Sequence, residues 1–315
     1  MVKVILRKIG FALITFFVMS ILVFVLVDAM PGDAAEITLG QASSPEALEN
    51  LREAMGLNDP GIVRYGRWLG NFVRGDLGES LYMKGVAINT LLWRKVANSA
   101  FLALFGLLFY IPVSIVLGII AGVNEGKAVD GIISVTGLSL MALPEYVSGV
   151  FLSLLFSVVL GWFPVSSALM LGTNITQNLN VLILPALSIT LIMVGYVSRM
   201  QRSSMARVIR SDYIRTAVLK GLPWRRVVFR HAMRNALLPT ITLIGMNMGW
   251  LFGGLVVVET LFGFPGLGLL ITTAIRTRDL PLIQATTLFI TFVYILSTFV
   301  TDLLYSYLNP RIRYQ

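Results

Sequence analysis

The sequence predicts an all-α membrane protein with six transmembrane helices. Of its 315 residues, 56% are hydrophobic and only 13% are charged, which leaves too little polar surface for a soluble domain. The basic residues gather in the links between long apolar runs, so the formal net charge of +9 indicates membrane topology. No nucleic-acid partner is expected.

The first apolar run, Phe11 to Val27, follows three basic residues near the N-terminus. It is longer than the core of a typical secretory signal, and more spans follow it. We therefore expect residues 1–27 to hold an uncleaved first transmembrane helix with its N-terminus in the cytoplasm.

Residues 28–95 turn polar, with nine acids and seven bases. They predict a small helical extracytoplasmic subdomain between the first and second spans. Ser44 is expected to cap a helix from Pro45 to Met55. A second, amphipathic helix is expected from Val63 to Val73, with an aromatic stripe. The stripe consists of Tyr65, Trp68 and Phe72.

Residues 96–315 are expected to form the transmembrane core. The five further spans are expected at Ser99–Val123, Gly131–Leu160, Val181–Val197, about Thr240–Val258 and about Leu282–Tyr305. Six spans with both termini in the cytoplasm place 16 of the 25 basic residues on that side, as the positive-inside rule requires.

The densest basic stretch is residues 199–239, which hold ten bases and one acid. We expect two short helices that meet at Gly221, with Pro223 in the first turn of the second. The apolar stripe of this loop consists of Leu219, Leu222, Val227, Val228 and Met233. A surface helix of this kind could dock into a groove of a cytosolic partner; the alternative is a loop that binds anionic membrane lipid.

This loop resembles the EAA coupling loop of binding-protein-dependent ABC importer permeases, in the dipeptide, oligopeptide and nickel branch. The similar segments are Asp212–Ala217, Lys220–Leu222 and Arg230–Pro239. The general pattern reads Glu-Ala-Ala, three residues, Gly, nine residues, Ile, one residue, Leu-Pro. Arg215, Thr216, Ala217 and Gly221 fill its first half. In the second half, His231, Met233 and Arg234 stand where Ile and Leu-Pro would fall, a departure usual in the peptide branch.

Two other segments resemble the same branch. The long first loop of its B-type subunit is similar, in order, to Met30–Asp33, Met55–Pro60, Tyr65, Trp68 and Gly75–Ser80. Val258–Gly268, continuing to Arg278–Pro281, is similar to the segment that packs beside the outer gate in this family.

The resemblance implies a type I ABC importer permease fold in a bacterial or archaeal cytoplasmic (inner) membrane. It implies as partners a homologous C-type permease subunit, two cytosolic ATPase subunits or one fused ATPase, and an extracytoplasmic substrate-binding protein. The implied substrates are di- or oligopeptides; nickel chelates, oligosaccharides and other small solutes stay open. The implied ATPase-coupling residues are Asp212, Tyr213, Arg215, Thr216, Ala217, Lys220, Gly221 and Leu222. The implied outer-gate residues are Glu259, Phe262, Pro265 and Gly266.

The chain itself is expected to be a permease and not an enzyme. Gly122–Ala128 superficially resembles a phosphate-binding loop, but its glycines are one residue too close, and Ala128 replaces the Ser or Thr that would hold magnesium. ATP and Mg are therefore expected on partner subunits. With no cysteine and a single histidine, His231, the chain offers no metal site and no nucleophilic triad.

Glu145 lies some fourteen residues into the expected third span, near mid-membrane. Together with Tyr146 it could lie on the translocation path. Alternatively, it could serve as a partner for a hydroxyl or backbone group where Pro144 breaks the helix. An ion-coupled secondary transporter is the rival function, but it would normally show internal repeats and more intramembrane ionisable groups. A membrane hydrolase would need a nucleophile with a neighbouring base.

Overall fold

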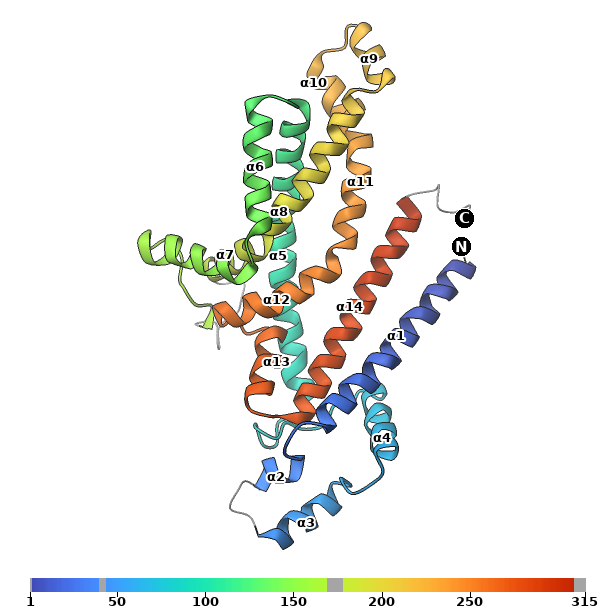
Figure 1. The fold of residues 1–315 in the computed structure, drawn as a ribbon, viewed down its shortest axis with the longest axis vertical. Helices are drawn as coiled ribbons and strands as arrows, with labels where there is room; N and C mark the ends of the chain where they lie inside the picture. Colours follow the sequence, from blue (N-terminus) through green and yellow to red (C-terminus); the bar gives the residue numbers. More distant parts are fainter. Residues whose placement is uncertain (1, 40–43, 169–177, 309–315) are drawn as a thin grey trace. The chain divides into compact units, whose positions relative to one another are not determined.

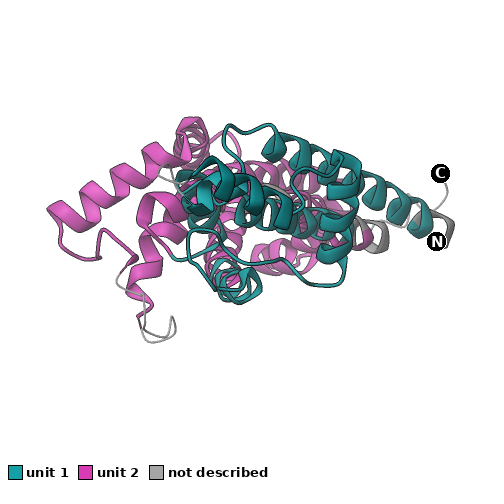
Figure 2. Cartoon of the chain, turned by 90° about the horizontal axis from the view of Figure 1, so that it is seen from below, with its two compact units in different colours: residues 1–99, 265–299 teal, residues 100–264, 300–315 magenta. Residues whose placement is uncertain are grey.

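The computed structural model describes residues 2–39, 44–168 and 178–308. Within these ranges the chain is helical and contains no β-strand, only an isolated bridge between Glu79 and Ala87. It divides into two compact units (Figure 2). Unit 1 comprises residues 1–99 and 265–299, and unit 2 comprises residues 100–264 and 300–315.

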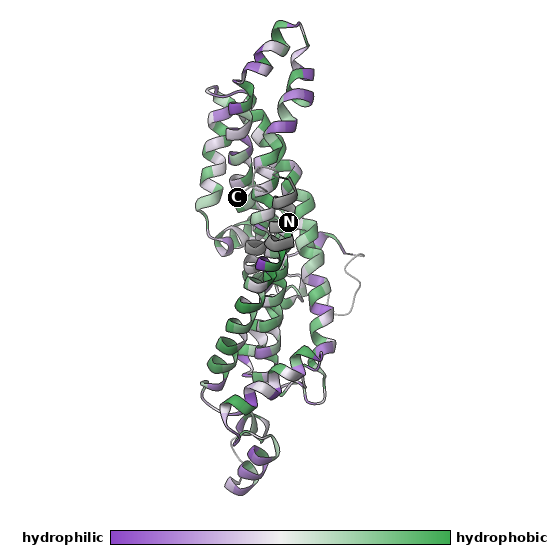
Figure 3. Cartoon of the chain, turned by 90° about the vertical axis from the view of Figure 1, so that its right-hand side faces the viewer, coloured by the Kyte–Doolittle hydropathy of each residue, from purple (hydrophilic) through white to green (hydrophobic). Residues whose placement is uncertain are grey.

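Four described helices are long and apolar enough to cross a membrane: α1 (Val2–Asp28), α5 (Ile88–Val123), α8 (Asn180–Ile209) and α14 (Leu280–Leu308). Two broken helix pairs also pass the same test, so the described residues provide four spans, or up to six if each pair is one span. Hydrophobic residues dominate the long helices (Figure 3). The chain is therefore a multi-pass membrane protein.

Several helices extend past the spans expected from hydropathy. α5 begins at Ile88 and not at Ser99, so it runs through the expected subdomain boundary at residue 95. α8 continues to Ile209, beyond the expected end at Val197. Hydropathy indicates where a helix leaves the apolar layer, whereas the helix itself continues until a breaking residue or a cap ends it.

The expected third span is not one straight helix. α6 (Ala128–Ala142) and α7 (Glu145–Leu152), which continues as the π-helical segment η1 (Ser153–Val159), meet at an angle of 107°. Pro144 lacks an N–H and disfavours helical backbone at the preceding residue, and Leu143 is accordingly extended. The residues expected to form one span from Gly131 to Leu160 therefore form a bent pair of helices, and the count of six spans stays a prediction.

The expected fifth span is also divided. α11 (Met233–Met246) ends at Asn247, and α12 (Met248–Phe262) follows directly. The broken pair found here joins residues Gly253–Phe262 of α12 to α13 (Leu267–Arg276). Gly263, at the end of α12, has the left-handed backbone (φ 62°) that terminates many helices.

In unit 1, a polar segment with three short helices connects α1 to α5. These are α2 (Ala34–Leu39), α3 (Pro45–Ala54) and α4 (Gly61–Val73). The expected cap is confirmed, since Ala47 N donates to Ser44 Oγ at 3.2 Å. This segment is called the α2–α4 segment below.

The aromatic stripe of α4 packs against α1 within unit 1. Tyr65 Oη and Ser20 Oγ form a hydrogen bond of 2.8 Å. The ring of Phe24 lies 5.5 Å from that of Tyr65 and 5.8 Å from that of Trp68. Aromatic pairs at these spacings add to the free energy gained by burial. The stripe predicted from the sequence therefore anchors α4 on α1.

Asp279 joins the α2–α4 segment to the start of α14. Its carboxylate is fully buried and accepts hydrogen bonds from the hydroxyl of Ser80 and from Tyr82 N (3.3 Å). It also accepts one from Leu282 N in the first turn of α14 (3.2 Å). A buried carboxylate needs such donors, and a helix N-terminus supplies one together with a favourable dipole.

In unit 2, α8 lies between α6 and α11, and α5 runs beside it (Figure 1). Two glycines of α5 allow a close approach to α8. A Cβ placed at Gly118 would lie 2.6 Å from the carbonyl oxygen of Ser198, and one at Gly122 would lie 2.8 Å from that of Arg202. Because both obstacles are main-chain atoms, larger side chains cannot be accommodated by a rotamer change.

We predict that Gly118→Ala lowers the stability of the protein by about 1–3 kcal/mol, because overpacking outweighs the gain in helix propensity. The matched control is Gly131→Ala in α6, where a Cβ would meet nothing within 4 Å. It should leave stability unchanged or raise it by under about 1 kcal/mol. The unfolding temperatures of the two variants are measured in detergent. Equal unfolding temperatures would contradict the close approach of α5 to α8.

Candidate functional site

The basic loop forms a compact tip at one end of unit 2, beyond the ends of α8 and α11 (Figure 1). This tip, residues 210–226, contains α9 (Asp212–Leu219) and the short α10 (Trp224–Arg226). The π-helical segment η4 (Val227–Ala232) then leads into α11. Residues 199–209 and 233–239, expected to belong to the loop, are instead parts of α8 and α11.

Gly221 ends α9 with left-handed backbone (φ 75°), a conformation that glycine adopts without strain. Its N–H donates to Val218 O at 2.9 Å, and Leu222 N donates to Ala217 O at 3.4 Å. The prediction that two helices meet at this glycine is confirmed. Pro223 occupies the N-cap of α10 and not its first turn.

The tip is anchored by a small apolar cluster. Ile214 and Ala217 on the inner face of α9 are buried, and they pack with Val227 and Val228 against Met205 of α8. Four of the five residues of the expected apolar stripe are buried or half-buried. The fifth, Leu219, is 80% exposed. Positions 214 and 217 face the cluster, so position 219 lies on the opposite side of the helix. Ile214 was missed from the sequence, although its spacing of three from Ala217 was a signal.

The expected coupling residues therefore divide into two groups. Ala217 is buried and Leu222 is half-buried, so these two hold the tip together. The other six, which are exposed, are Asp212, Tyr213, Arg215, Thr216, Lys220 and Gly221.

Large apolar side chains are exposed on the tip and the adjoining η4, despite its many charges. Leu219 is 80% exposed, Phe229 57% and Trp224 46%. The same stretch also carries five exposed bases: Arg215, Lys220, Arg225, Arg226 and Arg230. Exposed aromatic and aliphatic groups with a polar rim are typical of a surface that a protein partner covers.

An ion pair with a buried carboxylate and a partly exposed arginine connects α6 to α8 next to the tip. Arg202 donates from Nε to Asp130 Oδ1 and from Nη2 to Oδ2 at 2.6 Å. Asp130, with 4% of its surface exposed, also accepts from Gly126 N at 2.9 Å and from Ser134 Oγ at 3.2 Å. We call these four residues the α6–α8 clamp. A fork-shaped guanidinium suits such a carboxylate because both oxygens are bonded in fixed directions.

Two further polar contacts connect the tip to its surroundings. Arg210, at the end of α8, pairs with Glu125 in the turn between α5 and α6. Asn235 Nδ2, in α11, donates to the hydroxyl of Tyr213 in α9 at 2.8 Å. The tip is thus joined to α5, α8 and α11 within unit 2.

The clamp could not be predicted from the sequence. Its two charged residues are 72 positions apart, and Asp130 lies at the start of an apolar run. The neighbouring Gly122–Ala128 stretch, considered only as a phosphate-binding loop, ends α5 and makes the turn that supplies Gly126 N.

Glu145 begins α7 directly after Pro144 and is half-buried. A Cβ placed at Gly254 of α12 would lie 2.9 Å from Glu145 Oε1, so the carboxylate rests against this glycine. Its position in the first helical turn favours an anion. Tyr146, beside it, is 57% exposed. A place for these two residues on a translocation path stays a prediction.

The four expected outer-gate residues fall into different units. Glu259 and Phe262 of α12 are buried in unit 2, where Phe262 O accepts from Ser167 N at 2.8 Å. Pro265 and Gly266 belong to unit 1, where Pro265 O accepts from Asn98 Nδ2 at 2.8 Å. Their role in gating stays a prediction.

No group of three or more His, Cys, Asp or Glu side chains in the described part of the chain could hold a metal ion. His231 lies half-buried in η4. The tip is thus a charged surface with exposed apolar side chains, joined to the helices of unit 2.

Comparison with known proteins agrees with this geometry. Residues 114–314 match the family model for the binding-protein-dependent transport system inner membrane component, and residues 1–83 match the model for the N-terminal part of such membrane components. The chain is 37% identical over 297 residues to the oligopeptide transport system permease protein AppB of Bacillus subtilis, covering 94% of each chain. It is 36% identical over 336 residues to the di/tripeptide transport system permease protein DppB of Pseudomonas aeruginosa, covering all of both. It is also 36% identical, over the full length of both, to a putative peptide transport system permease protein of Brucella abortus.

We predict that Asp130→Asn destabilises the protein by roughly 1–3 kcal/mol, because it weakens the charge-assisted hydrogen bonds that join α6 to α8. The matched control is Glu125→Gln, which removes the acid of an ion pair whose arginine is 71% exposed. That exposed pair should contribute under about 1 kcal/mol. The midpoint temperatures of thermal unfolding are measured for both purified variants. A larger fall in midpoint for Glu125→Gln than for Asp130→Asn would contradict the stabilising role of the clamp.

Proposed function

The chain belongs to the family of binding-protein-dependent transport system inner membrane components, and we propose that it is one permease subunit of an ATP-driven importer of di- or oligopeptides. It is a permease and not an enzyme. The peptide assignment is supported by relatives that are named oligopeptide and di/tripeptide permeases and that match over nearly the whole chain. Nickel chelates, oligosaccharides and other small solutes are the alternative cargo of such an importer.

The proposed assembly has four kinds of subunit. A homologous C-type permease would form the other half of the pathway, and an extracytoplasmic substrate-binding protein would deliver the cargo. Two cytosolic ATPases, or one fused ATPase, would bind ATP and Mg. The exposed apolar and basic surface of the tip supports a docking role toward the ATPases.

The proposed orientation places the tip and both termini in the cytoplasm of a bacterial or archaeal cell and the α2–α4 segment outside its inner membrane. The distribution of charge supports this orientation, since ten of the 25 bases lie between residues 199 and 239.

The observation that carries the proposed mechanism is the rigid connection from the tip to the membrane helices. α9 packs on α8 and η4, and α8 continues without interruption for 30 residues from Asn180 to Ile209. The α6–α8 clamp joins α6 to α8, and the far end of α6 is the break at Pro144. Movement of the tip with the ATPases would therefore displace α6 and α8 together, and would change the helix packing around Glu145.

We predict that Gly221→Leu uncouples ATP hydrolysis from transport. The left-handed backbone at Gly221 strains a residue with a Cβ by roughly 1–2 kcal/mol, enough to lower uptake about tenfold. The matched control is Gly85→Leu, at a glycine with φ 77° where a Cβ likewise meets nothing within 4 Å.

Uptake of a labelled tripeptide and ATP hydrolysis are measured on the reconstituted complex. Gly221→Leu should keep hydrolysis and lose uptake, whereas Gly85→Leu should keep both. Wild-type uptake by Gly221→Leu would count against the coupling role, and uptake without ATP would favour an ion-coupled transporter.

A further inference from the structure

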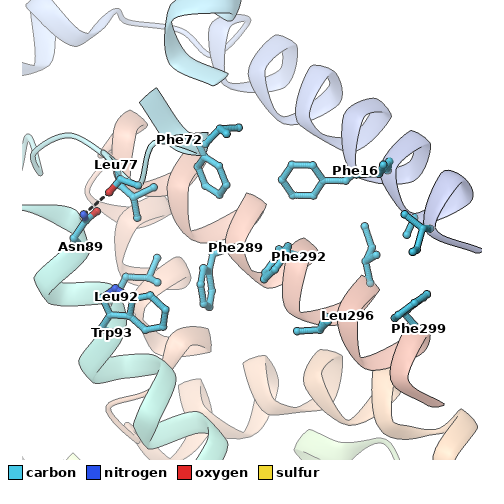
Figure 4. Close-up of a pocket in the computed structure, with 16 residues that line it drawn as sticks. Phe16, Phe72, Leu77, Asn89, Leu92, Trp93, Phe289, Phe292, Leu296 and Phe299 are labelled. Atoms are coloured by element: carbon cyan, nitrogen blue, oxygen red, sulfur yellow. Dashed lines mark hydrogen bonds between the residues drawn. The ribbon is translucent and has the colours of Figure 1, made fainter. Parts of the chain in front are cut away.

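Unit 1 contains an apolar cavity of about 550 Å³ that the transport mechanism does not use (Figure 4). It is lined by side chains of α1, α4, α5 and α14 and by the turn that follows α4. Six of the lining residues are aromatic: Phe16, Phe72, Trp93, Phe289, Phe292 and Phe299. Such a cavity suits an apolar ligand.

The cavity is elongated and borders the hydrocarbon layer. Lining residues of α14 extend from Phe289 to Phe299, ten residues or about 15 Å along the helix axis. α1, α5 and α14 are all candidate membrane spans. The lining residues Leu13 and Leu296 are 64% and 48% exposed, so the rim is covered by lipid in a membrane. The occupant indicated by this shape is an acyl chain.

One end of the cavity is polar. Asn89, at the start of α5, donates from Nδ2 to Gly75 O at 2.5 Å, which fixes the orientation of its amide. Its Oδ1 is buried and accepts no hydrogen bond from any described residue. Bulk water cannot reach a buried acceptor, and leaving one unsatisfied costs free energy. This amide therefore marks the polar end of the cavity, and a lipid headgroup there can be held only by the exposed groups beside it.

Two opposite charges flank this polar end. Arg74 and Asp76 are the immediate neighbours of the lining residue Gly75, and both are exposed. Neither forms an ion pair within the described ranges of the chain. Asp76 uses one oxygen to accept from Gly78 N at 3.0 Å and keeps the other free for a cation. The pair is complementary to a zwitterion with a phosphate and an ammonium group.

We propose that this cavity is a binding site for phosphatidylethanolamine. One acyl chain lies in the cavity along α14, the phosphate pairs with Arg74, and the ammonium group donates to Asp76. The bound lipid stabilises the packing of α1 against α4 and α14. With the orientation given under the proposed function, the site takes its lipid from the extracytoplasmic leaflet.

The test is native mass spectrometry of the full-length chain in the complex with which it co-purifies, delipidated and then titrated with lipid. Phosphatidylethanolamine is compared with phosphatidylcholine of the same acyl chains, which keeps the phosphate and the positive charge but has no N–H donor. Wild-type protein should retain phosphatidylethanolamine at about tenfold lower concentration, the effect of charge-assisted hydrogen bonds. Asp76→Asn should lose most of this preference and should still retain both lipids.

A second pair of variants tests the cavity itself. Ala12→Phe adds a phenyl group to a lining position and should abolish retention of both lipids. The control is Ile14→Phe, on the same helix but outside the lining and 61% exposed, which should retain both. The experiment measures mass and needs neither ATP nor uptake. The lipid site can therefore be disproved while the proposed transport function still holds.

Three results would overturn the site. Equal retention of the two lipids by the wild type would remove the role of the N–H donor. Equal retention by Ala12→Phe and Ile14→Phe would show that the lipid binds elsewhere. An assembled complex that retains no lipid at saturating phosphatidylethanolamine would mean that a partner subunit fills the cavity.

Discussion

Asp130 is a carboxylate with 4% of its surface exposed, and Arg202 reaches it with two nitrogens from a helix 72 positions further along the chain. Such a charge is tolerated only where every oxygen is paired, so α6 and α8 can separate here only at a high cost in free energy. The close approach of α5 to α8 at Gly118 and Gly122 places a third helix in the same body. Everything attached to these helices, including the tip, depends on this contact.

The two ends of this body differ in chemistry. At one end the tip presents Leu219 on α9, a short helix that two buried side chains anchor, together with Trp224 of α10 and several exposed bases. At the other end Pro144 interrupts α6, and Glu145 begins a new helix that lies against Gly254. In the proposed importer, the first end receives a displacement from the ATPases, and the second is where helix packing in the membrane changes. In this proposal, the packed helices between the two ends transmit the displacement, and the chain itself catalyses no reaction.

Local chemistry accounts for the parts that the sequence predicted. Gly221 is required by a left-handed turn, Ser44 caps a helix with its own hydroxyl, and the aromatic spacing on α4 selects its packing face. Each of these signals lies within a few residues of its effect. They suffice for the turn at Gly221, the start of α3 and the aromatic face of α4.

The remaining features depend on contacts between distant positions. Hydropathy cannot detect that α8 stays helical to Ile209 once it becomes polar, and composition cannot pair Asp130 with Arg202. The bend at Pro144 was foreseen only as one reading of Glu145, because proline is also tolerated inside α5 at Pro112 and inside α8 at Pro185. Whether a proline bends a helix depends on whether neighbouring groups can hydrogen-bond to the backbone carbonyl that the proline leaves unpaired.

The most direct measurement of the central claim is site-specific cross-linking, which the absence of cysteine from the chain makes simple. A single cysteine at Leu219, on the exposed side of the tip, carries a short photo-activated cross-linker in the intact complex. The control cysteine replaces Tyr146, which is also exposed. The account predicts a covalent product with a co-purified ATPase from position 219 and none from position 146. An assembled complex in which position 219 gives no such product, or in which only position 146 does, would contradict it.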